Sequence, residues 1–357
     1  MKNPFKFGTI VEDEYFTDRV DEVAYIRQFV QSANHLILIS PRRFGKSSVV
    51  AKAVKQSGRK SITVNLQQVT SVADLSAKLL REFFKIHPVQ HLKHAITHFR
   101  IIPTITTNEL TGMLDVTFQP GVDANMLLED VMTLIDSSQT ENDRLTIVLD
   151  EFQDILELDR HLDKKLRAIM QIQKHINYIL LGSQESMMSD IFEKKKSPFY
   201  HFGQLMRLGK LPRDDFHRYL SERLASCFPE QQSNELSGNI LDYTNCHPYY
   251  SQQLAANVWQ LGMLQPESTQ PISDAIRQII TSHSLDYERL WASFNRTNRW
   301  LLQRLASGNS LQTSEYPTST LYSALKQLQK KGYVIYTDSY ELEDPFFKEW
   351  LLKEMHA

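Results

Sequence analysis

The most informative run of residues in the sequence is Ser40-Pro41-Arg42-Arg43-Phe44-Gly45-Lys46-Ser47-Ser48. It follows the apolar residues 36–39 and precedes a helix-like run at residues 49–54, which predicts a strand, a tight loop and a helix. The backbone N–H groups of such a loop and the N-terminus of the helix attract the negative charge of a nucleotide's phosphates. Lys46 would reach the β- and γ-phosphates, and the Ser47 hydroxyl would bind Mg²⁺. The stretch therefore predicts a protein that binds ATP.

The loop departs from the usual pattern at its first position. That pattern is G-x-x-x-x-G-K-[ST], and Ser40 stands where the first glycine is expected. Serine is small, so the loop can close if this position avoids a positive φ, which glycine adopts at little cost. Gly-Lys-Ser alone is a weak signal that is also found at ordinary surface helices. The flanking strand and helix favour the nucleotide-binding interpretation.

A second motif, about a hundred residues further along the chain, supports the first. Residues 145–149 are apolar or β-branched, and Asp150 and Glu151 follow them. Such a run is typical of a central parallel strand that is covered on both faces. Asp150 would hold Mg²⁺ directly or through water, and Glu151 would act as a general base or orient the attacking water. The alternative is a strand that ends in solvated acids, which the upstream loop disfavours.

Composition restricts the class of protein. The chain has 357 residues, of which 41% are hydrophobic and 23% charged, as expected for a globular protein of two or three domains. The formal net charge of −2 argues against a chain that is basic throughout. Two cysteines are too few for a disulfide framework, no apolar run approaches the ~18 residues of a membrane helix, and the N-terminus lacks a secretory pattern. We therefore expect a cytoplasmic protein that has no membrane partner.

The apolar pattern predicts a sheet whose strands alternate with helices. Strands are expected at residues 36–40, 61–66, 145–150, 176–181 and 205–208. Residues 87–125 are less periodic and are interpreted as an insertion that carries a hairpin. The alternation predicts an α/β fold, namely a doubly wound parallel sheet with helices on both faces.

Gln184 directly follows Gly182 and Ser183 at the end of the fourth expected strand. A polar side chain at the carboxyl end of such a strand would touch the γ-phosphate or the attacking water. The alternative is a simple turn, and the residues by themselves favour neither.

The chain becomes helical after Pro212. Helical spacing covers residues 214–225, 234–243, 249–261 and 272–293. Two further helices and a short hairpin over residues 299–342 predict a winged-helix module. We therefore expect three domains: an ATPase core at 1–210 with its insertion at about 87–125, a helical lid at 211–293 and a winged helix at 294–357.

Together these motifs resemble the prokaryotic, archaeal-type P-loop ATPases at the border of the AAA+ and STAND groups. The similarity spans nearly the whole chain and is carried by residues 16–22, 41–47, 150–153, 182–188, 197–200, 247–250 and 343–350. It implies the P-loop NTPase fold of the ASCE and AAA+ type, with a helical lid and a C-terminal winged helix. It also implies ATP or ADP and Mg²⁺ as cofactors, and hydrolysis of ATP to ADP and phosphate.

The resemblance implies further site residues. Phe16 and Arg19 belong to an N-terminal segment that lies near the adenine in this family. His247 and Pro248 belong to a lid motif, in which the proline approaches the adenine or the phosphates in place of a sensor arginine.

The chain also departs from the family after residues 198–200. Many relatives carry an arginine there, whereas this chain has His201. If that arginine acts on the phosphates, this protein uses another one, such as Arg207, or hydrolyses ATP slowly. Arg42 and Arg43 would contact phosphate or an interface, or remain solvated loop charges.

Two functions stay open at this point. The first is an ATP-dependent molecular switch with slow turnover, which moves its lid and winged helix and signals to a protein partner or a homo-oligomer. The second is a DNA-binding AAA+ ATPase, similar to origin-binding or transposition-helper proteins, that contacts phosphates through Lys326, Lys330 and Lys331. The near-neutral charge of the chain weighs modestly against the second function.

Overall fold

The computed structural model describes the whole chain except residues 1, 12, 18, 89–95, 98, 101, 108–113, 120–122, 313–314, 338 and 355–357. The described residues form two compact units. The helical unit consists of Met1–Arg19, Ser40–Ser48 and Leu208–Ala357. The sheet unit consists of Val20–Ile39 and Val49–Arg207. The loop at residues 40–48, where we expect phosphates to bind and which we call the phosphate loop, therefore groups with residues 208–357, although it directly follows a strand of the sheet.

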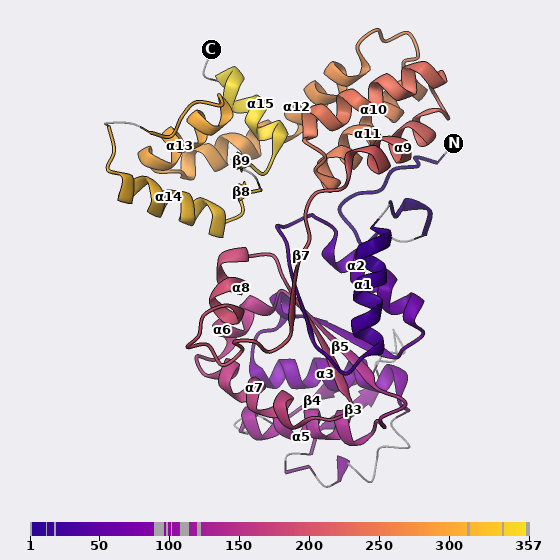
Figure 1. Ribbon diagram of the computed structural model, residues 1–357, viewed down its shortest axis with the longest axis vertical. Helices are drawn as coiled ribbons and strands as arrows, with labels where there is room; N and C mark the ends of the chain where they lie inside the picture. Colours follow the sequence, from indigo (N-terminus) through magenta and orange to yellow (C-terminus); the bar gives the residue numbers. More distant parts are fainter. Residues whose placement is uncertain are drawn as a thin grey trace. The chain divides into compact units, whose positions relative to one another are not determined.

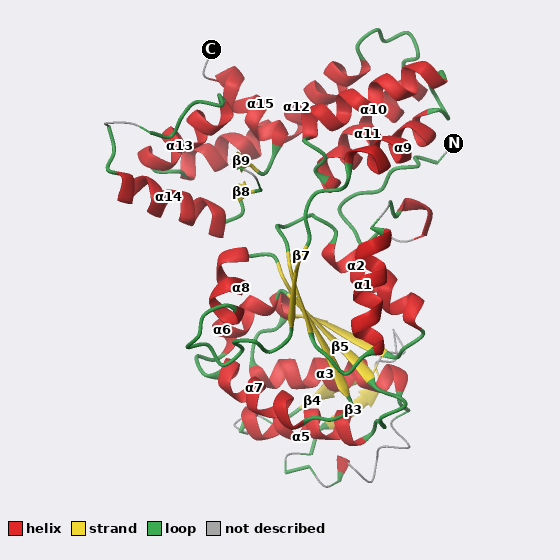
Figure 2. Cartoon of the chain, viewed as in Figure 1, coloured by secondary structure: helices red, strands yellow, loops and turns green. Residues whose placement is uncertain are grey.

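The sheet unit is built on a parallel sheet in the order β2-β5-β6-β1-β7 (Figures 1 and 2). Its strands are β1 (Leu36–Ile39), β2 (Ser61–Asn65), β5 (Leu145–Asp150), β6 (Ile176–Gly182) and β7 (Gln204–Arg207). Every residue of β1, β5 and β6 is buried, as expected for central strands covered on both faces. The prediction of a parallel α/β sheet is confirmed, and the strand bounds agree within one or two residues.

The strand register brings the carboxyl ends of the central strands to one edge of the sheet. Ile39 at the end of β1 is opposite Gly182, the last residue of β6. Asp150 at the end of β5 is opposite Asn65 of β2. Ligands of open parallel sheets bind at this edge.

Helices lie on both sides of this sheet (Figure 2). They are α1 (Val20–Gln31), α2 (Lys46–Ser57), α3 (Val72–Ile86), α5 (Ala124–Ser137), α6 (Ile155–Leu158), α7 (Leu162–Ile172) and α8 (Glu185–Phe192). Short 3-10 turns occur at Asp13–Tyr15, Leu66–Gln68 and Phe152–Asp154. Helix α3 begins after Ser71, whose hydroxyl accepts a hydrogen bond from the Asp74 N–H, and it packs against β2 and α5. The predicted hairpin is present as the antiparallel strands β3 (Thr104–Thr107) and β4 (Leu114–Thr117).

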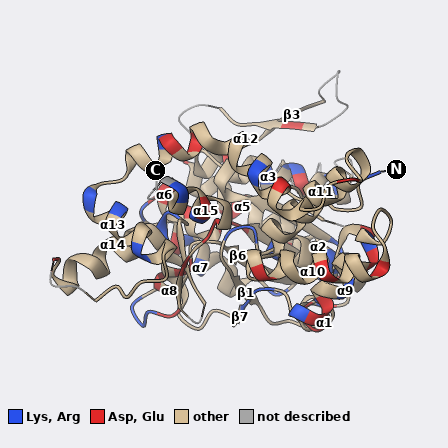
Figure 3. Cartoon of the chain, turned by 90° about the horizontal axis from the view of Figure 1, so that it is seen from above, with Lys and Arg blue, Asp and Glu red and all other residues tan. Residues whose placement is uncertain are grey.

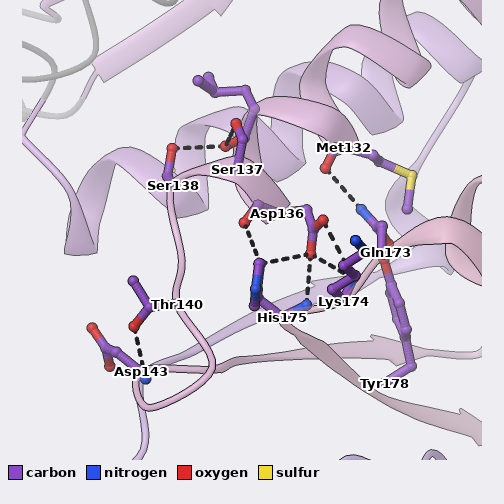
Figure 4. A network of polar contacts seen from close by, with 11 residues as sticks. Met132, Asp136, Ser137, Ser138, Thr140, Asp143, Gln173, Lys174, His175 and Tyr178 are labelled. Atoms are coloured by element: carbon purple, nitrogen blue, oxygen red, sulfur yellow. Dashed lines mark hydrogen bonds and ion pairs between the residues drawn. The ribbon is translucent and has the colours of Figure 1, made fainter.

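A polar cluster fixes the start of β6 on the side of the sheet away from the carboxyl edge (Figure 4). The Asp136 carboxylate at the end of α5 accepts hydrogen bonds from the backbone N–H groups of Lys174 and His175, at 3.1 and 2.8 Å. Gln173 donates to the carbonyl of Met132 on the same helix at 2.8 Å. These contacts satisfy backbone groups that would otherwise be lost at the helix–strand junction.

The helical unit contains the helices that are predicted to form a lid, here called the lid helices, and a C-terminal module, and the two share one apolar core. The lid helices are α9 (Arg213–Leu224), α10 (Glu230–Thr244), α11 (Pro248–Leu264) and α12 (Pro271–Ser293). The C-terminal module consists of α13 (Arg296–Ala306), α14 (Thr318–Lys330), β8 (Val334–Tyr336), β9 (Tyr340–Leu342) and α15 (Pro345–Glu354).

Helix α12 links the lid helices to the C-terminal module and packs against α15 (Figure 1). Two helices followed by an antiparallel hairpin agree with the predicted order of elements, and the further helix α15 follows them. That the module is a winged helix stays a prediction. The domain boundaries after residues 210 and 293 stay predictions. Among the described residues, no helix has the length and apolar character needed to cross a bilayer.

Candidate nucleotide-binding site

The phosphate loop lies between the end of β1 and the start of α2. Within the loop, the positive φ angles fall on Arg43 (64°) and Gly45 (84°), and Ser40 is not among the described residues with a positive φ. Ser40 is buried, and its hydroxyl donates to the carbonyl of Pro41 at 3.1 Å. The position that usually holds the first glycine therefore needs no glycine here. The left-handed backbone is instead imposed on Arg43, where a side chain costs about 1 kcal/mol.

The residues after the loop begin helix α2. Lys46 is the first residue of the helix and is buried, Ser47 is half-buried and Ser48 is buried. The Ser48 hydroxyl accepts a hydrogen bond from the Val11 N–H at 2.9 Å, which ties the N-terminal segment to the start of the helix. A helix N-terminus preceded by a loop with left-handed residues is a ready anion-binding site.

Arg43 is held by side chains of the lid and of the C-terminal module. Its Nη1 donates to the Tyr250 hydroxyl at 2.5 Å and lies 3.6 Å from Glu343 Oε2. Its guanidinium also lies over the Tyr249 ring, 4.8 Å from the centroid. The Tyr250 hydroxyl in turn donates to Glu343 Oε2 at 2.7 Å. The side chain of Arg43 is nevertheless 48% exposed, so solvent reaches this group.

The predicted lid residues His247 and Pro248 lie at the start of α11. His247 is the N-cap of α11, since its Nδ1 accepts the Tyr249 N–H at 3.2 Å, and Pro248 takes the first helical position, where its missing N–H costs nothing. The His247 ring packs edge-on against Phe44 of the phosphate loop, with centroids 4.8 Å apart. Burial, together with Lys210 and Arg43, lowers the pKa of His247 to about 3, so the ring is neutral at physiological pH.

Arg19 is buried and takes a left-handed backbone conformation, with a φ of 66°. Its Nη2 donates to the Gly209 carbonyl at 2.6 Å and its Nη1 to the Lys210 carbonyl at 3.4 Å. Arg19 thus fixes the segment that leads into the lid helices. Phe16 is half-buried in the same N-terminal segment.

The acidic end of β5 is organised by the end of β6. Asp150 is buried and its Oδ1 accepts the Glu151 N–H at 2.9 Å. Glu151 has a left-handed backbone with a φ of 54°, a strained conformation that is common in functional sites. Its Oε2 accepts the Ser183 hydroxyl at 2.6 Å, the Ser183 N–H at 3.2 Å and Gln153 Nε2 at 2.8 Å.

Ser183 is the functional candidate that the sequence analysis missed. That analysis selected Gln184, which lies one residue later at the N-cap position of α8 and makes no side-chain cap hydrogen bond. Strand β6 ends at Gly182, and the next side chain is the one that reaches across to the neighbouring strand. A hydroxyl directly after a buried strand was the available signal.

Arg207 lies at the end of the edge strand β7. Its Nη2 forms an ion pair with Glu193 at 3.0 Å, and both side chains are nearly half exposed. Such a pair is screened by solvent and exchanges readily.

The oxygen ligands predicted for Mg²⁺ belong to different units, because Ser47 is in the helical unit and Asp150 in the sheet unit. Within the described part of the chain, no group of three or more His, Cys, Asp or Glu residues could hold a metal by itself. A hydroxyl and a carboxylate fit Mg²⁺, which takes one or two protein oxygens and completes its shell with phosphates and water.

Neither a protein-family model nor a curated protein matches the chain. Solved structures do match, and what they share with this chain is the fold. The chain is similar to the Walker-type ATPase PABY2304 of Pyrococcus abyssi, with a TM-score of 0.69 and 16% identity over 96% of this chain and 97% of that one. It is also similar to the ORC2 protein of Aeropyrum pernix, with a TM-score of 0.57 and 15% identity over 99% of this chain and 100% of that one. The predicted fold class is thereby confirmed.

Proposed function

We propose that the protein is an ATP-dependent molecular switch of the AAA+ or STAND type, which hydrolyses ATP slowly and couples nucleotide state to a partner. The observation that carries the proposal is the conformation of the phosphate loop. Left-handed residues at Arg43 and Gly45 lead directly into a helix that begins at the buried Lys46. This is the arrangement by which backbone N–H groups cradle phosphates.

The chain's own residues supply the remaining functions of an ATPase. Lys46 would contact the β- and γ-phosphates, and Ser47 and Asp150 would hold Mg²⁺, which would supply charge neutralisation when bound. Glu151 orients and deprotonates the attacking water, and its carboxylate is held in place by Ser183. Gln184 is a further candidate for contact with the γ-phosphate.

The proposal includes the three domains: an ATPase core at residues 1–210, a helical lid at 211–293 and a winged helix at 294–357. Phe16, Arg19, His247 and Pro248 would receive the nucleotide on the side of the lid. Arg207 is paired with Glu193 on an exposed edge of the sheet. To stabilise the transition state, Arg207 would have to leave Glu193 and bind the phosphates. Catalysis of phosphoryl transfer relies on charge stabilisation. Because His201 stands where many relatives carry an arginine, we expect slow turnover.

A DNA-binding ATPase is the second candidate, and the exposed face of α14 favours it. Tyr322 is 52% exposed, Lys326 lies 4.7 Å from the centroid of its ring, and Lys330 and Lys331 are exposed at the end of the helix. Aromatic and basic side chains on an exposed helix are suited to contact with phosphates and bases. One structure of similar fold, the ORC1 protein of Aeropyrum pernix, was solved in complex with DNA, at 12% identity and a TM-score of 0.50.

Charge distribution weighs against strong DNA binding by the whole chain. Lys and Arg segments alternate with Asp and Glu segments along the ribbon (Figure 3), in keeping with the net charge of −2. Tight non-specific binding requires a concentrated basic surface.

The test is ATP turnover by the purified protein with and without duplex DNA, at low and moderate salt. Slow turnover that is indifferent to DNA supports the switch. Stimulation by DNA that is lost when Lys326, Lys330 and Lys331 are all changed to Gln supports the second candidate, because each phosphate contact adds to the salt dependence of binding. Protein that neither binds nor hydrolyses ATP would refute both.

A further inference from the structure

Both arginines of the phosphate loop reach the C-terminal module, within the helical unit. Arg43 approaches Glu343, which follows β9, as described above. Arg42 lies against the turn between α14 and β8, where its Cδ is 3.9 Å from the position that a Cβ on Gly332 would take. The loop that is expected to bind phosphate is thus in direct contact with the part of the chain that is expected to move.

Arg43, Tyr250 and Glu343 form a connected set that we call the latch. Arg43 donates to the Tyr250 hydroxyl, and this hydroxyl donates to Glu343 Oε2. The Glu343 side chain is only 9% exposed and Tyr250 is fully buried, whereas Arg43 is half exposed. The latch therefore consists of a buried carboxyl group and a cation that has access to solvent.

One side of the Glu343 carboxylate is not used by the latch. Neither Glu343 Oε1 nor His247 Nε2 has a hydrogen-bond partner among the described residues, although the two atoms lie 3.7 Å apart. Nδ1 of His247 accepts the Tyr249 N–H, so the neutral ring carries its proton on Nε2, which faces the carboxylate. A small movement would let His247 donate to Glu343. Glu343 thus has a second partner available if Arg43 leaves.

We propose that Glu343 competes with nucleotide phosphates for Arg43, so that ATP binding opens the latch and releases the C-terminal module from the phosphate loop. This inference rests on the proposed function of the loop. Arg43 is in the loop itself, its left-handed backbone stores strain, and a triphosphate offers several charges where Glu343 offers one. A protein in which only the open state binds ATP well has an apparent affinity reduced by the fraction of open protein.

A second ion pair on the same hairpin provides the matched control. Lys210 Nζ lies 2.5 Å from Glu341 Oε1, and Asn245 donates to Glu341 Oε2 at 2.8 Å. Glu341 is two residues from Glu343, and no contact between its side chain and Arg43 is present among the described residues. Loss of charge at Glu341 therefore perturbs the hairpin but leaves the latch intact.

The experiment compares the wild type with Glu343→Gln, Tyr250→Phe and the control Glu341→Gln. ATP dissociation constants come from titration calorimetry, and hydrogen exchange of the backbone over β9 and α15 is measured without nucleotide and with ATP. We expect Glu343→Gln to bind ATP about tenfold more tightly, which corresponds to the loss of one partly buried charge contact. We also expect its nucleotide-free exchange to match that of the ATP-bound wild type. Tyr250→Phe should shift both quantities in the same direction, and Glu341→Gln should leave the ATP affinity unchanged.

The outcomes separate the latch from the proposed function. If the wild type binds no ATP, the proposed function fails, and the exchange difference between the wild type and Glu343→Gln still reports whether the contact restrains β9 and α15. If ATP binds but neither Glu343→Gln nor Tyr250→Phe alters affinity or exchange, the latch is refuted and the switch stands. If Glu341→Gln tightens ATP binding as much as Glu343→Gln does, the effect belongs to the hairpin in general and the latch is likewise refuted. Tyr250→Phe keeps the buried ring, so it decides the question if Glu343→Gln fails to fold.

Discussion

The two halves of the candidate site are held in place by different kinds of contact. Asp150 and Glu151 end a buried strand whose backbone ladder and hydrogen bonds to Ser183 fix them. The phosphate loop depends instead on side chains, namely Arg43 with Tyr250 and Glu343, and Phe44 with His247. A backbone ladder is not displaced by a ligand, whereas an ion pair exchanges when a stronger anion arrives. Under the proposed function, the acids would provide the chemistry and the side-chain contacts of the loop would provide the regulation.

The largest expected effect comes from removing Lys46, the lysine that we expect to contact the phosphates. Lys46→Ala should weaken ATP binding by at least about a hundredfold, because a buried ammonium that contacts two phosphates cannot be replaced by water. Calorimetric titration with ATP measures the affinity, and circular dichroism checks that the fold is retained.

Lys55→Ala is the matched control for that variant. Lys55 lies in the last turn of the same helix and is exposed. The Lys55→Ala variant should therefore bind ATP with the affinity of the wild type. Equal ATP affinity in Lys46→Ala and Lys55→Ala would mean that the loop is not the phosphate site, and the division of roles between the two halves would fail.

Glu151→Gln should separate binding from chemistry. We expect unchanged ATP affinity and a fall in kcat of about 10²–10⁴-fold, the range of a lost general base. Ser183→Ala should lower kcat about tenfold with KM unchanged, since it removes only the hydroxyl that positions Glu151. Steady-state kinetics give both values.

Gln184→Ala is the informative comparison for Ser183→Ala, because the two residues are adjacent. A larger loss of kcat in Gln184→Ala than in Ser183→Ala would indicate that Gln184 contacts the γ-phosphate or the attacking water, and that Ser183 has a structural role. Wild-type turnover in Glu151→Gln would move the catalytic base elsewhere.

The pH dependence of stability should show the buried carboxyl group of the latch. Burial, partly offset by Arg43 and the Tyr250 hydrogen bond and reinforced by Asp344, raises the pKa of Glu343 from 4.5 to about 7. The native state then binds more protons than the unfolded state between these values, so this group makes stability fall as the pH rises from about 4.5 to 7. Relative to that of the wild type, the free energy of unfolding of Glu343→Gln should rise by about 1–3 kcal/mol as the pH increases from about 4.5 to 7. Urea unfolding at a series of pH values measures the difference.

His247 should make stability depend on pH in the opposite direction. Its pKa is lowered by burial from 6.5 to about 3, so the unfolded state binds more protons and stability rises with pH between these values. His247→Asn should therefore lose stability relative to the wild type as the pH rises from about 3 to 6.5. Parallel curves for the wild type and both variants would mean that Glu343 and His247 are solvated, which would contradict the burial of the latch.

Much of the fold could be predicted because the sheet strands are short apolar runs. Strand β5 was placed residue for residue, and the alternation of strands and helices fixed the parallel sheet. Helix α5 was missed, because it begins inside the interval that was interpreted as an insertion, although Asp123 caps it with hydrogen bonds to the N–H groups of Asn125 and Met126. The cap was readable in the sequence, but the irregular residues before it obscured the helix.

The site was only half predictable, for a physical reason. Lys46, Ser47, Asp150 and Glu151 follow from motifs that chemistry requires at fixed spacing. The contact of Arg43 with Glu343 joins residues 300 positions apart, and no local pattern relates them. Likewise, the side chain after β6 that reaches Glu151 is that of Ser183, and this depends on where β6 ends.

The smallest expected effect concerns the unusual first residue of the loop. Ser40→Gly restores the common pattern, yet Ser40 has no positive φ, so the change should cost about 0.5–1 kcal/mol of stability and leave the ATP affinity unchanged. Gly45→Ala is the comparison variant. Gly45 has a φ of 84°, and an added Cβ would meet no atom within 4 Å, so any effect of the change comes from backbone strain alone. It should weaken ATP binding about tenfold, because about 1–2 kcal/mol of strain opposes the loop conformation that binds phosphate. Tighter ATP binding by Ser40→Gly would show that the loop needs a flexible first position after all. In that case the conformation of Ser40, and not the contact of Arg43 with Glu343 alone, would control the affinity for ATP.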